Sequence, residues 1–272
     1  MTKGSCAESV TSEERNMQGQ EQSQYKWNLK GETMVYVMSD IHGNIRRFHS
    51  IMDQIHLQPD DDTLYILGDV IDRHPDGIQI LQEIMSMPNA QMLLGNHEYM
   101  MLNVVAPMDG IKLYYSPRKR WYDNHGQVTH RSFNKLSEEK RREIVRYLRS
   151  LPLNIDIEVK GIKYKLVHAS PVEFYQDFSF DSEAEFAVWY RLPDRIEEKT
   201  DYVLIHGHTP TTYYQDGSPL RIWHDGTNRI DIDCGSGFED GFVKGKTYYP
   251  EGRLACLRLD DMAEFYSEEI RT

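Results

Sequence analysis

The chain has 272 residues, of which 43 are acidic and 31 are basic, so its formal net charge at pH 7 is −12. This length is enough to bury a substantial core in one large domain or two small ones. The acidic balance disfavours a broad basic face for duplex nucleic acid, and no apolar run approaches the roughly 20 residues of a membrane span. We expect a globular protein that binds neither a nucleic acid duplex nor a membrane.

Cysteines are few, and their positions show no pattern. The three are Cys6, Cys234 and Cys256. An odd and widely spaced set argues against a disulfide framework and against a zinc site made of cysteines. No signal-peptide pattern opens the sequence, so we expect a cytoplasmic protein.

The first 26 residues are polar, with glutamine at every second position from 18 to 24. Such a segment cannot bury enough apolar surface to offset the entropy of ordering it. We therefore expect a flexible arm over residues 1–26 and one folded domain over residues 27–272.

From Met34 onward, the apolar pattern alternates between strand and helix. It predicts strands over residues 34–38, 63–67 and 91–94, and helices over 45–55, 77–85 and 97–105. Alternation of this kind is typical of βαβ units and a parallel sheet. Because the carboxyl ends of parallel strands lie at one edge of the sheet, polar residues that follow these strands should lie together.

A different composition follows between residues 107 and 152, which are rich in Arg, Lys and Tyr and show one clear helix, over 138–150. We expect this region to be a helical insertion packed beside the sheet. Beyond it, alternating patterns predict strands over residues 154–159, 163–167, 202–205, 229–232, 254–259 and 264–267. The predicted fold class is α/β, with two packed sheets and helices outside.

Polar side chains with metal-binding chemistry follow five of the predicted strands. They are Asp40, His42, Asp69, Asn96, His168 and His208. Oxygen and imidazole ligands without thiolates suit Mn²⁺, Fe or Zn²⁺, and six ligands exceed what one tetrahedral zinc needs. The set therefore predicts two metal ions in one crevice.

The order of these motifs resembles that of the calcineurin-like metallophosphoesterases. The motifs are Asp40-Ile-His42, Gly68-Asp69-Val-Ile-Asp72-Arg73, Gly95-Asn96-His97-Glu98, His168 and Gly207-His208. They are most similar to the phosphoprotein-phosphatase branch, which includes bacterial and phage serine/threonine phosphatases and diadenosine tetraphosphatases. The resemblance implies a four-layer fold in which two mixed β-sheets form a sandwich between helices.

The resemblance also implies a role for each residue. Asp40 and His42 would bind the first metal, Asp69 would bridge both, and Asn96, His168 and His208 would complete the second. His97 would be the general acid, oriented by Asp72, and Asp72 would favour its protonated form. The phosphate would be bound by Arg73, Arg191, Asn96 and His97. The two ions would be Mn²⁺, with Fe or Zn²⁺ as alternatives, and would activate a bridging hydroxide that attacks phosphorus.

Some residues near these motifs have more than one interpretation. His206 precedes His208 by two positions, so an extended strand would place both on one face and His206 could compete as a ligand. The glycine-rich segment 241–247 has too few spacer residues for a phosphate-binding loop and is interpreted as a turn between late strands. The basic runs 118–120 and 140–142 are interpreted as solvated helix charges, with steering of an acidic substrate as the alternative.

The sequence favours a phosphomonoesterase that acts on phosphoserine or phosphothreonine in proteins. A nucleotidase that cleaves diadenosine tetraphosphate or related nucleotides is the alternative, because the motifs are shared. Four aromatic residues of the insertion could stack on a base or could pack the insertion onto the body: Tyr114, Tyr115, Trp121 and Tyr122. An inactive binding scaffold is disfavoured because all six predicted ligands are present.

Overall fold

The computed structural model describes residues 33–107, 116–175, 180–194, 200–238, 243–244, 247–248 and 251–268. The chain divides into two compact units, Met1–Thr33 and Met34–Thr272, and the fold below is that of the second. The arm expected over residues 1–26 lies outside the described residues, as do Tyr114 and Tyr115. None of the described helices combines the length and the apolar character needed to cross a bilayer.

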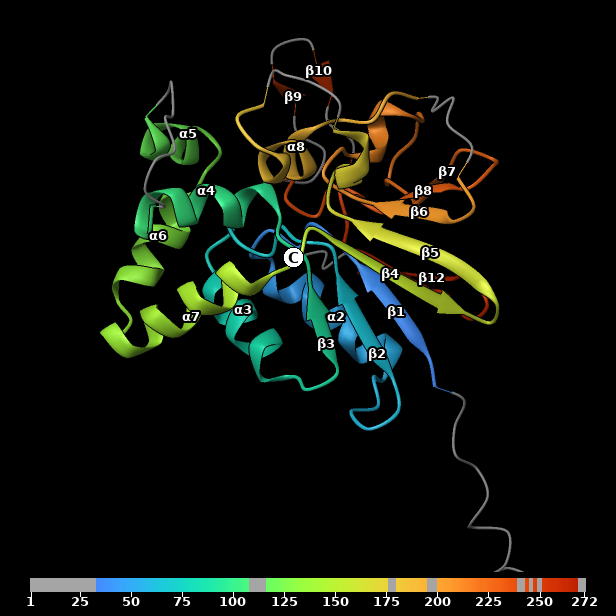
Figure 1. The fold of residues 1–272 in the computed structure, drawn as a ribbon, viewed down its shortest axis with the longest axis horizontal. Helices are drawn as coiled ribbons and strands as arrows, with labels where there is room; N and C mark the ends of the chain where they lie inside the picture. The colour runs from blue at the N-terminus through green and yellow to red at the C-terminus, as the bar shows by residue number, and fades with distance from the viewer. Residues whose placement is uncertain are drawn as a thin grey trace, which may run out of the picture. The chain divides into compact units, whose positions relative to one another are not determined.

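The first sheet has five described strands in the order β12-β11-β1-β2-β3 (Figure 1). They are β1 (Val35–Met38), β2 (Thr63–Ile66), β3 (Ala90–Met92), β11 (Ala255–Arg258) and β12 (Ala263–Tyr266). β1, β2 and β3 run parallel, whereas β11 pairs antiparallel with both β1 and β12. The crossovers are helices α2 (Ile45–Ile55) and α3 (Gly77–Ser86), as the alternation predicts.

The second sheet has five described strands in the order β4-β5-β6-β8-β7. They are β4 (Asn154–Val159), β5 (Ile162–Val167), β6 (Val203–His206), β7 (Trp223–His224) and β8 (Arg229–Asp231). β5, β6 and β8 run parallel, and β4 and β7 are antiparallel edges. Two short strands, β9 (Val243–Lys244) and β10 (Thr247–Tyr248), pair with each other, and residues 241–242 and 245–246 of the expected turn lie outside the described residues.

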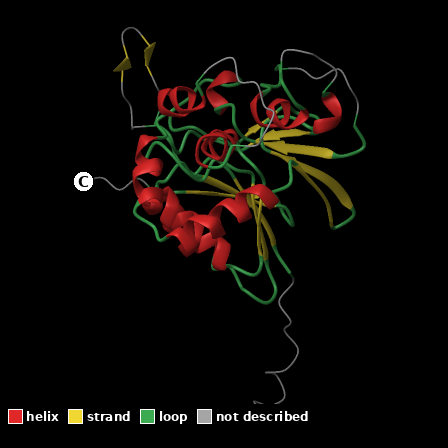
Figure 2. Ribbon diagram, turned by 60° about the vertical axis from the view of Figure 1, so that its left-hand side comes forward, coloured by secondary structure: helices red, strands yellow, loops and turns green. Residues whose placement is uncertain are grey.

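Alternation along the central strands produces two cores. On β1, Tyr36 and Met38 pack with Phe48 of α2, whereas Val37 packs with Ile205 from the second sheet. Successive side chains of a strand point to opposite faces, so one face of this sheet packs on helices and the other on a second sheet. Figure 2 shows the two sheets with helices outside them. The predicted fold class, two mixed sheets in a sandwich flanked by helices, is confirmed.

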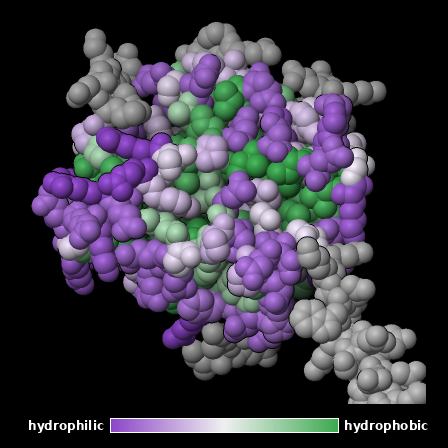
Figure 3. Space-filling model, turned by 60° about the horizontal axis from the view of Figure 1, so that its bottom comes forward, coloured by the Kyte–Doolittle hydropathy of each residue, from purple (hydrophilic) through white to green (hydrophobic). Residues whose placement is uncertain are grey.

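The insertion contains more helix than the sequence predicts. After α4 (Asn96–Val105), the described residues form α5 (Pro117–Asp123), α6 (Gln127–Asn134) and α7 (Glu138–Ser150). Only α7 was expected, because α5 and α6 are too short to show a helical period. Another short helix, α8 (Glu183–Trp189), and the 3₁₀ turns η1 (Val172–Phe174) and η2 (Thr211–Tyr213) were also missed. Hydrophilic side chains cover much of the face drawn in Figure 3, with apolar groups between them.

Candidate metal and phosphate site

The six predicted metal ligands lie together at the carboxyl ends of the strands. Asp40 and His42 follow β1, Asp69 follows β2, Asn96 begins α4 after β3, and His168 and His208 follow β5 and β6. All six are buried, and His208 is the most exposed at 8%. The parallel strands of the two sheets therefore deliver side chains that are far apart in the chain to one crevice, as the sequence predicts.

Asp69 lies between two groups of potential ligands. Its Oδ2 is 3.8 Å from Nε2 of His42 and 3.8 Å from Nε2 of His97, and its Oδ1 is 3.5 Å from Nε2 of His168. The ligand atoms of His42, Asp69 and His97 lie within 4.8 Å of one another, as do those of Asp69, His168 and His208. One carboxylate is thus positioned to serve two ions.

Asp40 and Asn96 add further oxygen atoms to the potential ligands around Asp69. Oδ1 of Asp40 is 3.8 Å from Nε2 of His42. Oδ1 of Asn96 is 2.9 Å from Nε2 of His168 and 2.9 Å from Nδ1 of His208. The other oxygen of Asp40 accepts the backbone N–H of His208 at 3.0 Å, which ties the loops after β1 and β6 together.

Each of the three imidazoles His42, His168 and His208 also directs its second ring nitrogen at a backbone carbonyl. The contacts are His42 Nδ1 to Ile71 O at 3.2 Å, His168 Nδ1 to Leu67 O at 2.8 Å and His208 Nε2 to Trp189 O at 3.2 Å. Burial lowers the pKa of all three histidines, so the neutral ring with a single N–H is favoured. A ring that donates this N–H to the carbonyl presents a lone pair to the crevice.

Lone pairs of nitrogen and oxygen therefore face one another across the crevice. A neutral imidazole has one N–H, so a ring that donates it to a backbone carbonyl has a lone pair left on its other nitrogen, and a cation among these atoms would bind that lone pair. Burial also raises the pKa of the Asp69 carboxyl well above its usual value, and a charged Asp69 needs a cation beside it. The residues present thus fit metal ions on their own geometry.

The backbone at the site is strained. Six of the sequence-predicted residues have a positive φ: Asp40 (54°), His42 (52°), Asp69 (53°), Asp72 (71°), Arg73 (69°) and His208 (65°). Each costs about 1–2 kcal/mol for a residue with a Cβ, so surrounding contacts must hold these conformations. Strain concentrated in this way is typical of functional sites.

Glu98 holds the loop after β2, a role that the sequence analysis missed. Its Oε2 accepts the N–H of Asp69 at 2.9 Å, and its Oε1 accepts those of Val70 at 3.0 Å and Ile71 at 3.2 Å. Burial raises the pKa of Glu98 to about 7. Its position next to His97 was the one signal in the sequence, and it did not indicate which backbone the carboxylate would bind.

His97 and Asp72 form the expected pair, with Nδ1 and Oδ2 separated by 2.7 Å. Two residues of the insertion support Asp72. Nε1 of Trp121 donates to the same Oδ2 at 2.7 Å, and the backbone N–H of Asp72 donates to Oγ1 of Thr129 at 2.9 Å. Neither contact could be found from the sequence, because no motif links the insertion to the loop after β2.

The pKa values of this pair differ from the expectation. Pairing with Asp72 should favour the protonated imidazole, but burial outweighs it and lowers the pKa of His97 to about 4. Burial also raises the pKa of Asp72 to about 7, against hydrogen bonds from Thr129 and Trp121 that lower it. Between about pH 4 and pH 7 the pair therefore carries one titratable proton in addition to the single N–H of the neutral imidazole, so a hydrogen can lie between Nδ1 and Oδ2 while Nε2 carries another.

Two arginines border the crevice. The charge of Arg73 lowers the pKa of both His42 and His97, and its guanidinium lies 6.0 Å from the ring centroid of Phe238. The charge of Arg191 lowers the pKa of His208. Both predicted phosphate-binding arginines are therefore close enough to act on the buried histidines electrostatically.

His206 does not join the site, although it was an alternative ligand. Strand β6 ends at His206, and the positive φ of His208 turns the chain out of the extended conformation. The two imidazoles therefore do not share a face. Nε2 of His206 accepts a hydrogen bond from Nε of Arg229 at 2.9 Å, so this nitrogen is already occupied.

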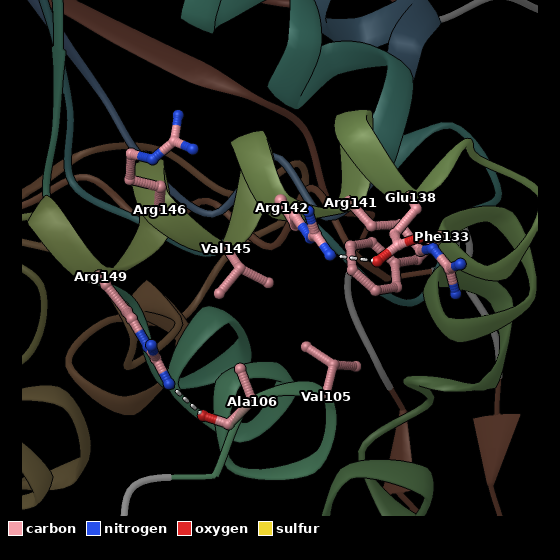
Figure 4. Close-up of a pocket in the computed structure, with 9 residues that line it drawn as sticks. All are labelled: Val105, Ala106, Phe133, Glu138, Arg141, Arg142, Val145, Arg146 and Arg149. Carbon is pink, nitrogen blue, oxygen red and sulfur yellow. Dashed lines mark hydrogen bonds and ion pairs between the residues drawn. The ribbon is translucent and has the colours of Figure 1, made fainter.

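The basic runs are only partly solvated. Arg120 pairs with Glu185 at 2.6 Å and stacks 4.4 Å from the ring centroid of Trp189. On α7, several arginines line a separate groove of about 660 Å³ beside the end of α4 (Figure 4). Its described lining residues are Val105, Ala106, Phe133, Glu138, Arg141, Arg142, Val145, Arg146 and Arg149. With a single carboxylate and no imidazole among these residues, the groove has no ligand set for metal ions.

Curated relatives carry the names of two kinds of phosphatase. The chain is 26% identical over 162 residues to serine/threonine-protein phosphatase 2 of Salmonella typhimurium, a match covering 60% of this chain and 69% of the relative. It is 32% identical over 137 residues to the symmetrical bis(5'-nucleosyl)-tetraphosphatase of Aromatoleum aromaticum, covering 50% of this chain and 43% of the relative. The chain thus matches less than half the length of that tetraphosphatase.

The fold and a family model agree with these matches. The crystal structure of a metallophosphoesterase from Sphaerobacter thermophilus superposes with a TM-score of 0.52 and 16% sequence identity, covering 89% of this chain and 90% of the other. The model of the calcineurin-like phosphoesterases matches residues 33–233, which contain every predicted ligand. The chain belongs to the calcineurin-like phosphoesterase family.

Proposed function

We propose that this protein, a metal-dependent phosphoester hydrolase by its family, is a dinuclear phosphomonoesterase that acts on phosphoserine or phosphothreonine in proteins. The observation that carries the proposal is the set of carboxylate, amide and imidazole ligand atoms that converge around Asp69, with 2.9–3.8 Å between neighbouring atoms. The name of the Salmonella relative, whose length this chain mostly covers, supports the choice of substrate.

In this proposal, Asp40 and His42 hold one ion and Asn96, His168 and His208 hold the other, with Asp69 between them. Two bound dications would lower the pKa of a water nucleophile and neutralise phosphate oxygens in the transition state. Oxygen and imidazole ligands suit Mn²⁺, which we propose as the metal, with Fe and Zn²⁺ as the alternatives.

The remaining residues of the site bind the substrate and deliver a proton. Arg73 and Arg191 bond phosphate oxygens, because a guanidinium can donate to two oxygens at once. Asn96 and His97 contact the same phosphate. The Nε2 hydrogen of His97 passes to the departing alkoxide while the proton shared with Asp72 moves onto Nδ1, which leaves the imidazole neutral and Asp72 ionised, and Asp72 keeps the ring oriented during the transfer.

The nucleotidase alternative relied in part on aromatic residues of the insertion that could stack on a base, and the structure gives two of them other contacts. Trp121 is fully buried and its Nε1 is bonded to Asp72, so it packs the insertion onto the body and cannot stack on a base. Tyr122 is bonded through its hydroxyl to Nδ1 of His130 at 2.7 Å. Both described aromatic residues of the set therefore have structural partners, which favours a phosphoprotein substrate.

A substrate panel tests the proposal. The purified protein, assayed with Mn²⁺ and again with a chelator, should release phosphate from a phosphoserine peptide faster than it cleaves a dinucleoside tetraphosphate. The reverse preference would identify a nucleotidase, and activity that survives the chelator would remove the metal ions from the reaction. The cytoplasmic location expected from the sequence stays a prediction.

The role of His97 has its own test. His97→Ala should retain nearly all of its bound metal and lose about 10²–10⁴-fold in kcat on alkyl phosphates. The loss should be much smaller on an aryl phosphate, because a good leaving group needs no proton. Equal losses on both substrates would remove His97 from the acid role, and loss of metal would assign it to the ligand group that includes His42 and Asp69.

A further inference from the structure

Arg191 belongs to a short segment after α8 in which three successive residues, Arg191, Leu192 and Pro193, each contact a side chain from elsewhere in the chain. The guanidinium of Arg191 lies 4.9 Å from the ring centroid of Tyr213, although the side chain is exposed. The carbonyl of the next residue, Leu192, accepts a hydrogen bond of 3.0 Å from the hydroxyl of Tyr214. An exposed arginine on a loop would otherwise be free to adopt many rotamers, so these contacts limit where it can point.

The carbonyl of the third residue, Pro193, accepts a hydrogen bond from Nη1 of Arg229. Arg229 is only 2% exposed, and its Nε donates to Nε2 of His206 at 2.9 Å. Its guanidinium lies 4.7 Å from the ring centroid of Tyr214 and 5.1 Å from that of Trp223. One buried guanidinium thus joins the segment that carries Arg191 to the strand end that leads to His208.

We infer that Arg229 is a positioning residue, which fixes Arg191 relative to the candidate ligand His208 so that the phosphate meets both at a set distance. The expected effect of Arg229 on phosphate binding rests on the proposed function. The connection that Arg229 makes between Pro193 and His206 rests on the geometry alone.

The chemistry of Arg229 favours this role over simple packing. A buried cation is expensive to desolvate, and an apolar side chain would fill the space between Tyr214 and Trp223 at lower cost. What arginine adds is a planar set of donors that reaches acceptors on two different segments at once. Lysine carries its donors on one terminal nitrogen and lacks this planar fork, so it should hold Pro193 and His206 less well than arginine does.

Arg253 offers a matched control. Its guanidinium lies 4.0 Å from the ring centroid of Tyr266, and its Nε donates to the carbonyl of Leu220 at 2.5 Å. Like Arg229, it has one buried Nη2 without a partner among the described residues. None of the contacts among the described residues joins Arg253 to Arg191, Pro193 or His206, so Arg253→Gln should leave the Arg191 segment in place.

The first measurement is amide hydrogen exchange of the metal-free protein, read on the peptide that spans residues 188–194. Arg229→Gln should increase the exchange rate there by about tenfold, since the loss of a charge-assisted hydrogen bond is of that order. Arg253→Gln should leave that peptide unchanged, and Arg229→Lys should fall between Arg229→Gln and the unmodified protein. Unchanged exchange in Arg229→Gln, or equal acceleration in Arg253→Gln, would overturn the inference.

The second measurement is inhibition by inorganic phosphate with Mn²⁺ present. Arg229→Gln should raise the inhibition constant about tenfold, and the double variant with Arg191→Gln should be no worse than Arg191→Gln alone, because residues that act through one another are not additive. Additive losses would overturn the positioning role. If the unmodified protein neither hydrolyses phosphate esters nor binds phosphate, the proposed function is wrong. The exchange experiment would still show whether Arg229 holds the segment that carries Arg191.

Discussion

Trp121 donates a hydrogen bond of 2.7 Å from Nε1 to Oδ2 of Asp72, the same oxygen that lies 2.7 Å from Nδ1 of His97. Trp121 belongs to α5 of the insertion and is fully buried. A Cβ added at Gly126 would collide with the indole ring, so the close approach of this glycine fixes where the ring lies. The insertion is therefore part of the support of the His97–Asp72 pair.

Replacing Trp121 by Phe should change the proton chemistry of the site. The hydrogen bond from Trp121 lowers the pKa of Asp72, so Trp121→Phe should raise it and let the pair keep its shared proton to higher pH. The pair would also lose one of its orienting contacts, and kcat on a phosphoserine peptide should fall about tenfold. The pH dependence of kcat on that peptide measures both effects.

Tyr122→Phe is the control for this substitution, because it removes a hydrogen bond on the same helix that goes to His130 and not to Asp72. It should leave the pH profile where it is. A shift of the profile in Tyr122→Phe as large as that in Trp121→Phe would mean that general loosening of α5 is responsible.

The pH dependence of the unmodified protein follows from the same pair. Burial raises the pKa of Asp72 to about 7 and lowers that of His97 to about 4, so below about pH 7 the pair carries one proton more than above it, and with that proton Nε2 of His97 can hold a hydrogen for transfer. The rate on a phosphoserine peptide should therefore fall as the pH rises through about 7. The rate on an aryl phosphate should not fall over the same interval, and parallel profiles would show that another group limits both reactions.

Much of the site could be predicted because it depends on strand ends. The continuous apolar run Val35-Tyr36-Val37-Met38 identifies β1, and a parallel sheet brings the residue after such a strand to the same edge as the others. The positions of the candidate ligands follow from that topology, whatever the rest of the chain does. The mixed sandwich follows in the same way from alternating strands later in the sequence.

The contacts that support the ligands could not be predicted, because they join segments that no periodicity relates. Trp121 reaches Asp72 from a seven-residue helix, too short to be recognised from its apolar pattern. His206 was an alternative to His208 as a ligand because an extended strand was expected to continue through both. The strand ends one residue after Ile205, and a single left-handed residue sends the two rings in different directions.

Glu98 should be essential for the stability of the loop after β2. Its carboxylate accepts three backbone N–H groups, from Asp69, Val70 and Ile71. In Glu98→Gln, the amide nitrogen must face at least one of these donors, and an unsatisfied buried donor costs about 1–3 kcal/mol. Urea denaturation should show a loss of this size in the free energy of unfolding.

Glu83→Gln is the matching control, since Glu83 contacts His49 at 2.9 Å in a partly exposed pair. Exposed pairs contribute about 0–1 kcal/mol, so this variant should be close to the unmodified protein. If Glu98→Gln were as stable as Glu83→Gln, the loop would not depend on the carboxylate, and the strain at Asp69 would need another support.

The metal content of two variants should distinguish the roles of His168, which follows β5, and His206, which ends β6. His168 donates its Nδ1 hydrogen to Leu67 O and presents Nε2 to Asn96 and Asp69, so His168→Gln should lose at least one of the two ions. His206 is equally buried, but its Nε2 is already occupied by Arg229, so His206→Gln should retain both. Elemental analysis of each variant, purified with Mn²⁺ and dialysed, gives the number of bound ions. Because each variant removes a fully buried imidazole, loss of fold alone should affect both, so comparable metal loss in His206→Gln would contradict this distinction between the two histidines.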